Sequence, residues 1–261
     1  MKNLIAIVTH KQADIPLQEG YKIIAVGKNK IEYKDMLRDN TGINIAEKNP
    51  NYCELTAHYW LWKNLNDEYN NIGLVHYRRF FGKKRFFSAP DNILSVTEIN
   101  KLLSKADIIL PKEFYWPCSV EEYYYDHGVG KKQDIKEVEE IIKQYYPEYY
   151  ENYRNVTKRN HASYCNMFIM KKNMFDSYSE WLFSVLAHVE ERVDISSYTA
   201  AEARIFGYLS EILINVWVEQ HHFKIARVPM METEYPEKNY TAHVLKRIKI
   251  NLINTIKFYL S

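Results

Sequence analysis

The chain has 261 residues, of which 46% are hydrophobic, so it is long enough to bury a sizeable core without disulfides or a structural metal. Its three cysteines have neither metal-binding nor redox spacing, which excludes a disulfide scaffold and favours a reducing cytoplasmic compartment. The net charge is +2; residues 236–261 carry five basic residues and one acid, so the tail is +4 and the rest −2. A slightly acidic body without a basic stripe argues against a nucleic-acid partner.

Strand-like and helix-like segments alternate along the chain. Short apolar runs predict strands at 4–8, 21–27, 72–75, 106–111, 164–170 and 223–228. Helical patterns are expected at 51–65, 97–103, after 170 and at 200–220. Between 112 and 160 one helix is expected, with Asp134 and Glu137 as its capping box and Pro147 at its end. This order predicts a Rossmann-type α/β domain with a mostly parallel sheet over residues 1–235, followed by a tail at 236–261.

The apolar run at 72–75 ends abruptly in His76, Tyr77, Arg78 and Arg79. In open α/β sheets, ligands bind outside the carboxyl ends of the strands. Two guanidinium groups at such a place suit a phosphate-bearing ligand, because their planar forks hold oxyanions and keep their charge. A purely solvating role for this arginine pair is the alternative.

Four segments occur in an order that resembles a known family: Asn51–Trp60, Gly73–Arg79, Tyr164–Phe168 and Arg204–Glu211. The chain is similar to a bacterial family described only as a domain of unknown function, found in capsular and exopolysaccharide gene clusters. Members of that family look like GT-A-fold glycosyltransferases, and some are assigned to transfer galactose, including its furanose form. The resemblance implies a GT-A-like fold, a UDP-sugar donor and a hexosyltransferase activity.

Most GT-A enzymes place an Asp-x-Asp motif at the end of the corresponding strand, where it holds Mn²⁺ or Mg²⁺. No such motif occurs in this chain, and the nearest pattern is Glu232-Thr233-Glu234. Because arginines can meet phosphate charge directly, we expect Arg78, with Arg79 as the second residue, to replace the metal, so that no cofactor is needed. Dependence on Mn²⁺ or Mg²⁺ is the alternative. His76 is expected to donate to a phosphate or to the sugar.

Four further residues are expected around the donor. Thr9 and Lys11 follow the first strand, where Thr9 could bind the uracil or ribose and Lys11 a phosphate; an ordinary polar turn is the alternative. Glu54 lies on a helix that would pack beside the donor sugar. Asn166 interrupts an apolar strand, so its amide either binds donor or acceptor or is a satisfied core group.

The catalytic base is expected on the helix at 200–220. An inverting transferase needs a carboxylate to accept the proton of the acceptor hydroxyl. Glu211 is the first choice, with Arg204 two helical turns away to orient it or reach the phosphate, and Glu202 is the second.

Acceptor contacts are expected in the aromatic segment at 123–128. Tyr125 can stack on a sugar and Asp126 can bond its hydroxyls, while His127 is an alternative acid–base residue. A structural tyrosine cluster is the competing interpretation.

In the tail, Val244, Ile248, Leu252, Ile256 and Leu260 recur every four residues, with Lys246, Arg247 and Lys257 expected largely opposite. Such a basic amphipathic helix can lie on an anionic membrane. It would suit a peripheral enzyme on the inner face of the cell membrane, acting on a glycan linked to polyprenyl diphosphate. Docking of the helix on its own domain or on a second subunit, as in a homodimer, is the alternative.

Two other functions fit the same residues. A retaining hexosyltransferase would use the donor phosphate to help deprotonate the acceptor. A non-catalytic module that binds sugar nucleotides or carbohydrates would need the pocket but no base.

Overall fold

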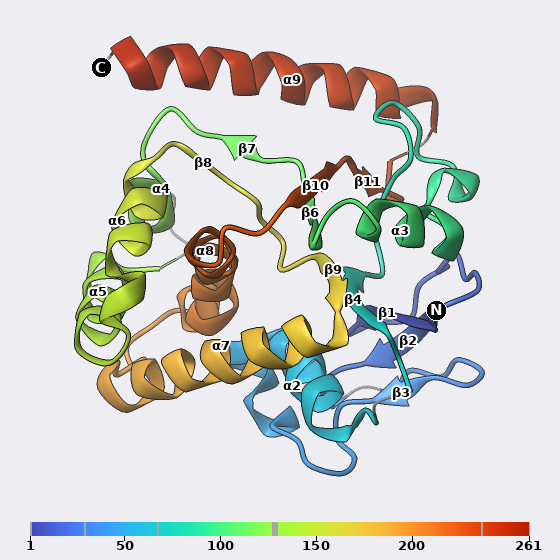
Figure 1. Ribbon diagram of the computed structural model, residues 1–261, viewed down its shortest axis with the longest axis horizontal. Helices are drawn as coiled ribbons and strands as arrows, with labels where there is room; N and C mark the ends of the chain where they lie inside the picture. The colour runs from blue at the N-terminus through green and yellow to red at the C-terminus, as the bar shows by residue number, and fades with distance from the viewer. Residues whose placement is uncertain (1, 29, 67, 127–129, 236, 261) are drawn as a thin grey trace.

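The computed structural model describes residues 2–28, 30–66, 68–126, 130–235 and 237–260. Its main sheet has the strand order β10-β6-β9-β4-β1-β2-β3 (Figure 1). These strands are β1 (Asn3–Thr9), β2 (Tyr21–Ala25), β3 (Leu37–Arg38), β4 (Asn71–His76), β6 (Ile108–Pro111), β9 (Phe168–Lys171) and β10 (Ile225–Val228). The short strands β5 (Arg79–Phe81) and β11 (Met230–Glu232) extend it beyond β4, while β7 (Phe114–Tyr115) and β8 (His161–Ala162) pair separately.

The sheet is mostly parallel, as predicted. Strand β1 runs parallel to both β2 and β4, β2 to β3, and β6 to β10. Only β9 among the strands of the main path is antiparallel to its neighbours, β4 and β6. The predicted α/β class is therefore confirmed.

Helices cover both faces of the sheet. They are α1 (Asn49–Tyr52), α2 (Leu55–Asn64), α3 (Val96–Leu103), α4 (Val120–Asp126), α5 (Lys132–Tyr145), α6 (Tyr150–Lys158), α7 (Lys172–Arg192), α8 (Ile205–Gln220) and α9 (Glu237–Leu260). Alternate residues of β1 show the two layers: Leu4 and Ala6 join the core formed with α2, α7 and α8, whereas Ile5 joins the core formed with α3 and the start of α9. Since both faces are buried, the strands read as continuous apolar runs.

Two predicted elements have different boundaries because backbone turns interrupt them. The helix expected at 51–65 is split into α1 and α2 at Cys53, whose φ is 52°. The strand expected at 164–170 begins only at Phe168, because Cys165 and Asn166 have φ values of 77° and 48°. Asn166 therefore lies in a left-handed turn before β9 and does not interrupt a strand.

Capping residues were the other source of error. Helix α3 begins at Val96 after its cap Ser95, one residue before the start expected at 97. Asp134 lies at the third position of α5, where it accepts a hydrogen bond from the Lys131 backbone at 2.7 Å, so its expected role as the first cap is wrong. The described residues between 112 and 160 form three α-helices, α4, α5 and α6, in place of the one expected.

The tail forms helix α9, which lies along the upper edge of the molecule in Figure 1, on the side opposite α7. Tyr240 and Val244 are buried in the core, whereas Leu252, Ile256 and Leu260 are exposed. A spacing of four residues drifts by about 40° per step on a helix with 3.6 residues per turn, so the predicted stripe winds from the buried to the exposed side. Within the described part of the chain, no helix is long and apolar enough to cross a membrane.

Candidate active site

A cleft of about 720 Å³ lies at the carboxyl ends of β1, β2 and β4. The chain leaves β1 toward β2 on one side and later returns to β4 on the other, so the gap between β1 and β4 is a topological switch point. Ligands bind at such points in open α/β sheets. The lining of this strand-end cleft includes His10, Gly27, Asn49, Glu54, Arg78 and Arg204.

A second cleft, of about 460 Å³, adjoins the first. The lining of this aromatic cleft includes Phe114, Trp116, Tyr123, Tyr164 and Tyr235, together with His243 and Arg247 from α9. The rings of Trp116 and Tyr123 are stacked, with centroids 3.6 Å apart. Four residues line both clefts and form the wall between them: Arg79, Cys165, Tyr208 and Glu211.

Glu211 lies in the second turn of α8, in this shared wall. Burial and, to a smaller extent, the nearby Glu54 raise the pKa of its carboxyl group to about 8, against the opposing effects of a hydrogen bond from the Cys165 backbone and of Arg79 and Arg204. A carboxylate with such a pKa is a stronger base than an ordinary glutamate, and it reaches both clefts. It is therefore suited to proton transfer between two ligands bound side by side.

The two adjacent arginines have different environments. Arg78 forms an ion pair with Glu234, its Nη1 lying 2.9 Å from a carboxylate oxygen. Arg79 lines both clefts, and its buried Nε has no hydrogen-bond partner among the described residues. Since buried donors are almost always satisfied, Arg79 is the guanidinium better placed to bind an anionic ligand. From the sequence, Arg78 was placed before Arg79 as the residue that binds phosphate, whereas this geometry favours Arg79.

Arg204 supplies a second cation at the rim of the strand-end cleft. Its Nε donates to the Cys53 sulfur at 3.0 Å, and its guanidinium lies over the Tyr208 ring, 5.4 Å from the centroid. Arg204 and Glu211 are both brought to the cleft, as the spacing of two helical turns predicted.

His76 and Thr9 occupy the predicted region but bond differently from the expectation. The Nε2 atom of His76 lies 2.6 Å from the Cys165 carbonyl oxygen, to which it donates. Burial lowers the pKa of His76, so the ring is neutral and its Nδ1 is an acceptor. In this tautomer the ring N–H is used by the Cys165 carbonyl, and donation from His76 to a phosphate or to the sugar stays a prediction. The Thr9 hydroxyl is buried and donates to the Lys11 carbonyl at 2.6 Å, so it does not face a ligand.

Lys11 lies outside the strand-end cleft. Its Nζ is 3.8 Å from a Glu234 oxygen and 5.0 Å from the centroid of the Tyr77 ring. Lys11 lines a neighbouring hollow with Tyr77 and Arg78, and these last two side chains also border the strand-end cleft. The structure thus brings Tyr77 to the site, while Lys11 lies beside it.

Asn166 connects three parts of the site. Its Nδ2 donates to Glu54 at 2.7 Å and to the Gly207 carbonyl at 2.9 Å, and its Oδ1 accepts from the Ser210 hydroxyl at 2.8 Å. The amide is buried and fully used, so Asn166 positions Glu54 against α8 and does not contact a ligand itself. Of the two alternatives stated from the sequence, these contacts favour a satisfied core amide over direct binding of donor or acceptor.

Replacing Asn166 with alanine is expected to lower the free energy of unfolding by about 2–4 kcal/mol, because buried partners lose their hydrogen bonds and alanine disfavours a positive φ. Asn166→Gly removes the same hydrogen bonds but accepts the backbone conformation, so it should be the less destabilised of the two. Urea unfolding of both variants measures the two free energies of unfolding. Equal stabilities would show that the left-handed backbone contributes nothing at this position.

The remaining predicted residues lie away from the two clefts or outside the described residues. Tyr125 packs at the edge of the core and Asp126 is exposed at the end of α4; neither borders the aromatic cleft. Glu202 accepts from the Thr199 backbone at 2.8 Å and belongs to the turn before α8. His127 lies outside the described residues.

Sequence reasoning missed several residues that line the clefts. His10 comes directly after Thr9, the last residue of β1, so its place at the carboxyl end of a strand could have identified it. Tyr208 lies four residues after Arg204 and three before Glu211, so helical spacing could have identified it. Tyr123 and Tyr124, not Tyr125, line the aromatic cleft, and a repeated Tyr-Tyr-Tyr gives no indication of which ring points inward.

Among the described residues, no group of three or more His, Cys, Asp or Glu side chains is arranged to hold a metal ion. Glu232, the nearest candidate by sequence, lies beside His243 and pairs with Arg247 at 3.2 Å. Glu234 pairs with Arg78. These contacts occupy both carboxylates, and metal independence remains a prediction for experiment.

The fold and the site together define an α/β protein with a cleft at the strand carboxyl ends and a second cleft that shares the Glu211 carboxylate. The chain belongs to the family described as domain of unknown function DUF4422, which matches residues 4–222.

The chain is also similar to a solved structure, the WbbM bifunctional glycosyltransferase in its apo form, with a TM-score of 0.79 and 28% sequence identity. The similarity covers 90% of this chain and 46% of that one, so this chain spans less than half the length of that protein. No protein of curated function matches this chain.

Proposed function

We propose that this protein is a glycosyltransferase that moves a hexosyl group from a UDP-sugar to a glycan acceptor. The observation that carries the proposal is the position of Glu211, a carboxyl group with a raised pKa in the wall shared by two clefts. Two adjoining ligand sites with one base between them are what a direct transfer between two bound substrates needs. The similarity to the WbbM bifunctional glycosyltransferase supports the same class.

The UDP-sugar would occupy the strand-end cleft. The nucleotide would lie over the ends of β1 and β2, near His10 and Gly27, and the diphosphate near Arg79 and Arg204. Guanidinium groups would neutralise the charge that develops on the leaving UDP, which is the role of the metal in metal-dependent enzymes. Glu54, held by Asn166, would face the transferred sugar.

The acceptor sugar would lie in the aromatic cleft, against the rings of Trp116 and Tyr123. In an inverting reaction, the Glu211 carboxylate accepts the proton of the acceptor hydroxyl while that oxygen attacks the anomeric carbon. The bond from this carbon to the phosphate oxygen breaks, and UDP leaves with the electron pair. The family resemblance favours galactofuranose or galactose as the hexose and a polyprenyl-diphosphate-linked capsular or exopolysaccharide glycan as the acceptor.

UDP release from a panel of UDP-sugars is the experiment that tests this function. We expect release from UDP-galactofuranose or UDP-galactose when acceptor is added, and the same rate with EDTA as with Mn²⁺, because arginines take the place of the metal. Release only with Mn²⁺ would contradict the metal-free mechanism. Binding of the UDP-sugar without release, even with lipid-linked acceptors, would favour a non-catalytic module, and proton NMR of the product would distinguish inversion from retention.

A further inference from the structure

The outward side of α9 carries a series of apolar side chains. The exposed fraction is 63% for Leu252, 73% for Tyr259 and 83% for Leu260. Leu245, Ile253 and Ile256 are exposed on the same helix. With 100° between successive residues, all six fall on one side of the helix. Single exposed leucines are ordinary, whereas a series along one helix side marks an interaction surface.

Three lysines accompany these apolar residues on the exposed side. They are Lys246, Lys249 and Lys257, and none forms an ion pair with another described residue. No acidic residue follows Glu237 in the sequence. The exposed side therefore combines apolar contact area with uncompensated positive charge.

The opposite side of α9 is fixed to the domain. Tyr240 and Val244 are buried, and Arg247 pairs with Glu232. Further along, Asn254 donates to the Tyr115 carbonyl at 2.9 Å. The helix therefore lies along the surface of the domain and presents its outer side as one flat edge of the molecule (Figure 1). Arg247, expected from the sequence on the lysine side, belongs to the docked side.

We infer that this outer side of α9 rests on an anionic lipid bilayer. Leucine, isoleucine and tyrosine side chains enter the boundary between headgroups and acyl chains, and lysines beside them attract anionic headgroups. A second copy of the chain is the weaker fit, because a two-fold interface would bring two sets of unpaired lysines together without any acid to neutralise them.

The inference also bears on the aromatic cleft and, in this respect, rests on the proposed function. His243 and Arg247 line that cleft from the inner side of α9. A bilayer against the outer side of α9 would therefore place the cleft within one helix diameter, about 10 Å, of the headgroups. The sugar of a lipid-linked acceptor could then reach the aromatic cleft while its lipid stays in the bilayer.

Vesicle co-sedimentation of the full chain tests the inference without requiring turnover. We expect binding to vesicles of phosphatidylcholine with phosphatidylglycerol, and much weaker binding to phosphatidylcholine alone or at high salt. Replacing the three lysines with alanine should weaken binding roughly 100-fold, at about fivefold for each lysine. Leu252→Ser with Ile256→Ser should also weaken it.

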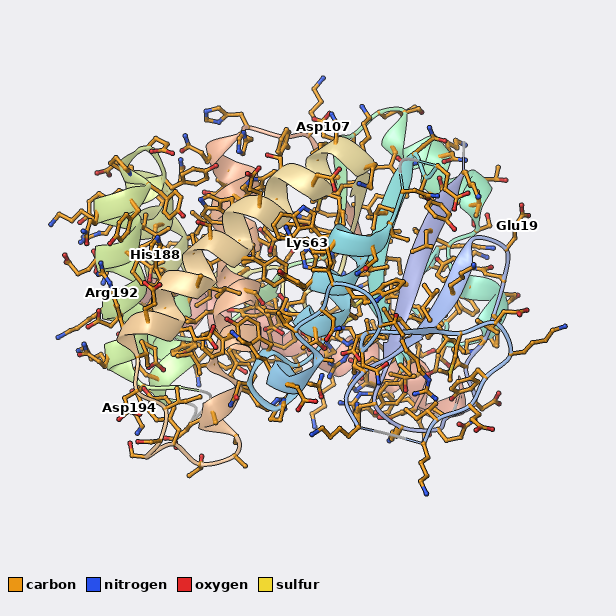
Figure 2. The ribbon with its side chains drawn as sticks, turned by 90° about the horizontal axis from the view of Figure 1, so that it is seen from below. Glu19, Lys63, Asp107, His188, Arg192 and Asp194 are labelled. Carbon is orange, nitrogen blue, oxygen red and sulfur yellow. The ribbon has the colours of Figure 1, made fainter. Side chains whose placement is uncertain are left out.

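A matched control uses lysines on other surfaces: Lys63→Ala, Lys136→Ala and Lys143→Ala. Figure 2 shows Lys63 on the face seen from below, away from α9. This control should bind as the unmodified chain does, and thermal unfolding verifies that every variant folds. The inference would be overturned if the chain did not bind vesicles, if it bound neutral vesicles equally well, or if the lysine or the Leu252→Ser, Ile256→Ser variants bound as strongly as the unmodified chain. It would also be overturned if light scattering showed a dimer and the Leu252→Ser, Ile256→Ser variant were monomeric. Loss of UDP release with intact vesicle binding would count against the proposed function alone.

Discussion

Replacing Glu211 with glutamine is expected to lower kcat for glycosyl transfer by about 100- to 10,000-fold, which is the usual contribution of a general base. Glutamine has nearly the same shape but accepts no proton, so the UDP-sugar should still bind in the strand-end cleft. Initial-rate measurements of UDP release and calorimetric titration with the UDP-sugar separate these two quantities. Glu202→Gln is the matched control, because Glu202 lies in the turn before α8 and outside both clefts.

The pH dependence gives an independent readout of the same residue. The Glu211 carboxylate is the active form, so kcat/KM should rise with pH through about 8, the raised pKa of this group. Glu211→Gln should remove this rise from the residual activity. Full transfer activity in Glu211→Gln would contradict the assignment and favour a retaining reaction in which the donor phosphate assists deprotonation.

Stability should change in the opposite direction to activity. The pKa of Glu211 is raised by folding, so its protonated form is the one the fold stabilises. The resulting stability is fully present below the ordinary glutamate pKa of about 4.5 and is lost as the pH rises toward 8. At pH 8, Glu211→Gln should therefore be more stable than the unmodified chain, by an amount on the order of 4 kcal/mol.

The parts of the fold predicted well are those that depend on a repeated local pattern. The strands at 4–8 and 72–75 are continuous apolar runs, and a sheet covered on both faces requires such runs. Glu211 and Arg204 were predicted to share a side because helical spacing depends only on the number of residues between them.

The errors arise where contacts distant in sequence decide the conformation. Nothing near Asn166 indicates a left-handed turn, since its partners Glu54 and Ser210 are 112 and 44 residues away. His76 likewise bonds to a carbonyl 89 residues away. Which of Arg78 and Arg79 is better placed to bind an anionic ligand depends on Glu234, 156 residues beyond Arg78. Local sequence identified the polar residues at the strand ends but not the partners that fix their roles.

Replacing Arg79 with alanine is expected to lower kcat/KM for the UDP-sugar by about 100- to 1,000-fold. Removing one preorganised donor from a site where negative charge develops usually costs about 3–4 kcal/mol. The buried Nε of Arg79 has no partner among the described residues, so this donor is available to the leaving diphosphate. Arg79→Lys should recover only part of the loss, because an ammonium group keeps the charge but lacks the planar fork. Steady-state kinetics with EDTA present measures both variants.

Comparison with the adjacent arginine makes this result specific. Arg78 is already paired with Glu234, so Arg78→Ala should reduce kcat/KM less than Arg79→Ala does. Arg192, on α7 at the face shown in Figure 2, lies outside both clefts, and Arg192→Ala should retain full activity. A larger loss of kcat/KM in Arg78→Ala than in Arg79→Ala would agree with the sequence analysis, which placed Arg78 first. It would mean that substrate binding releases Arg78 from Glu234. If Mn²⁺ restored the activity of Arg79→Ala, a metal could take the position of the guanidinium, and the two would be interchangeable ways of neutralising the same diphosphate.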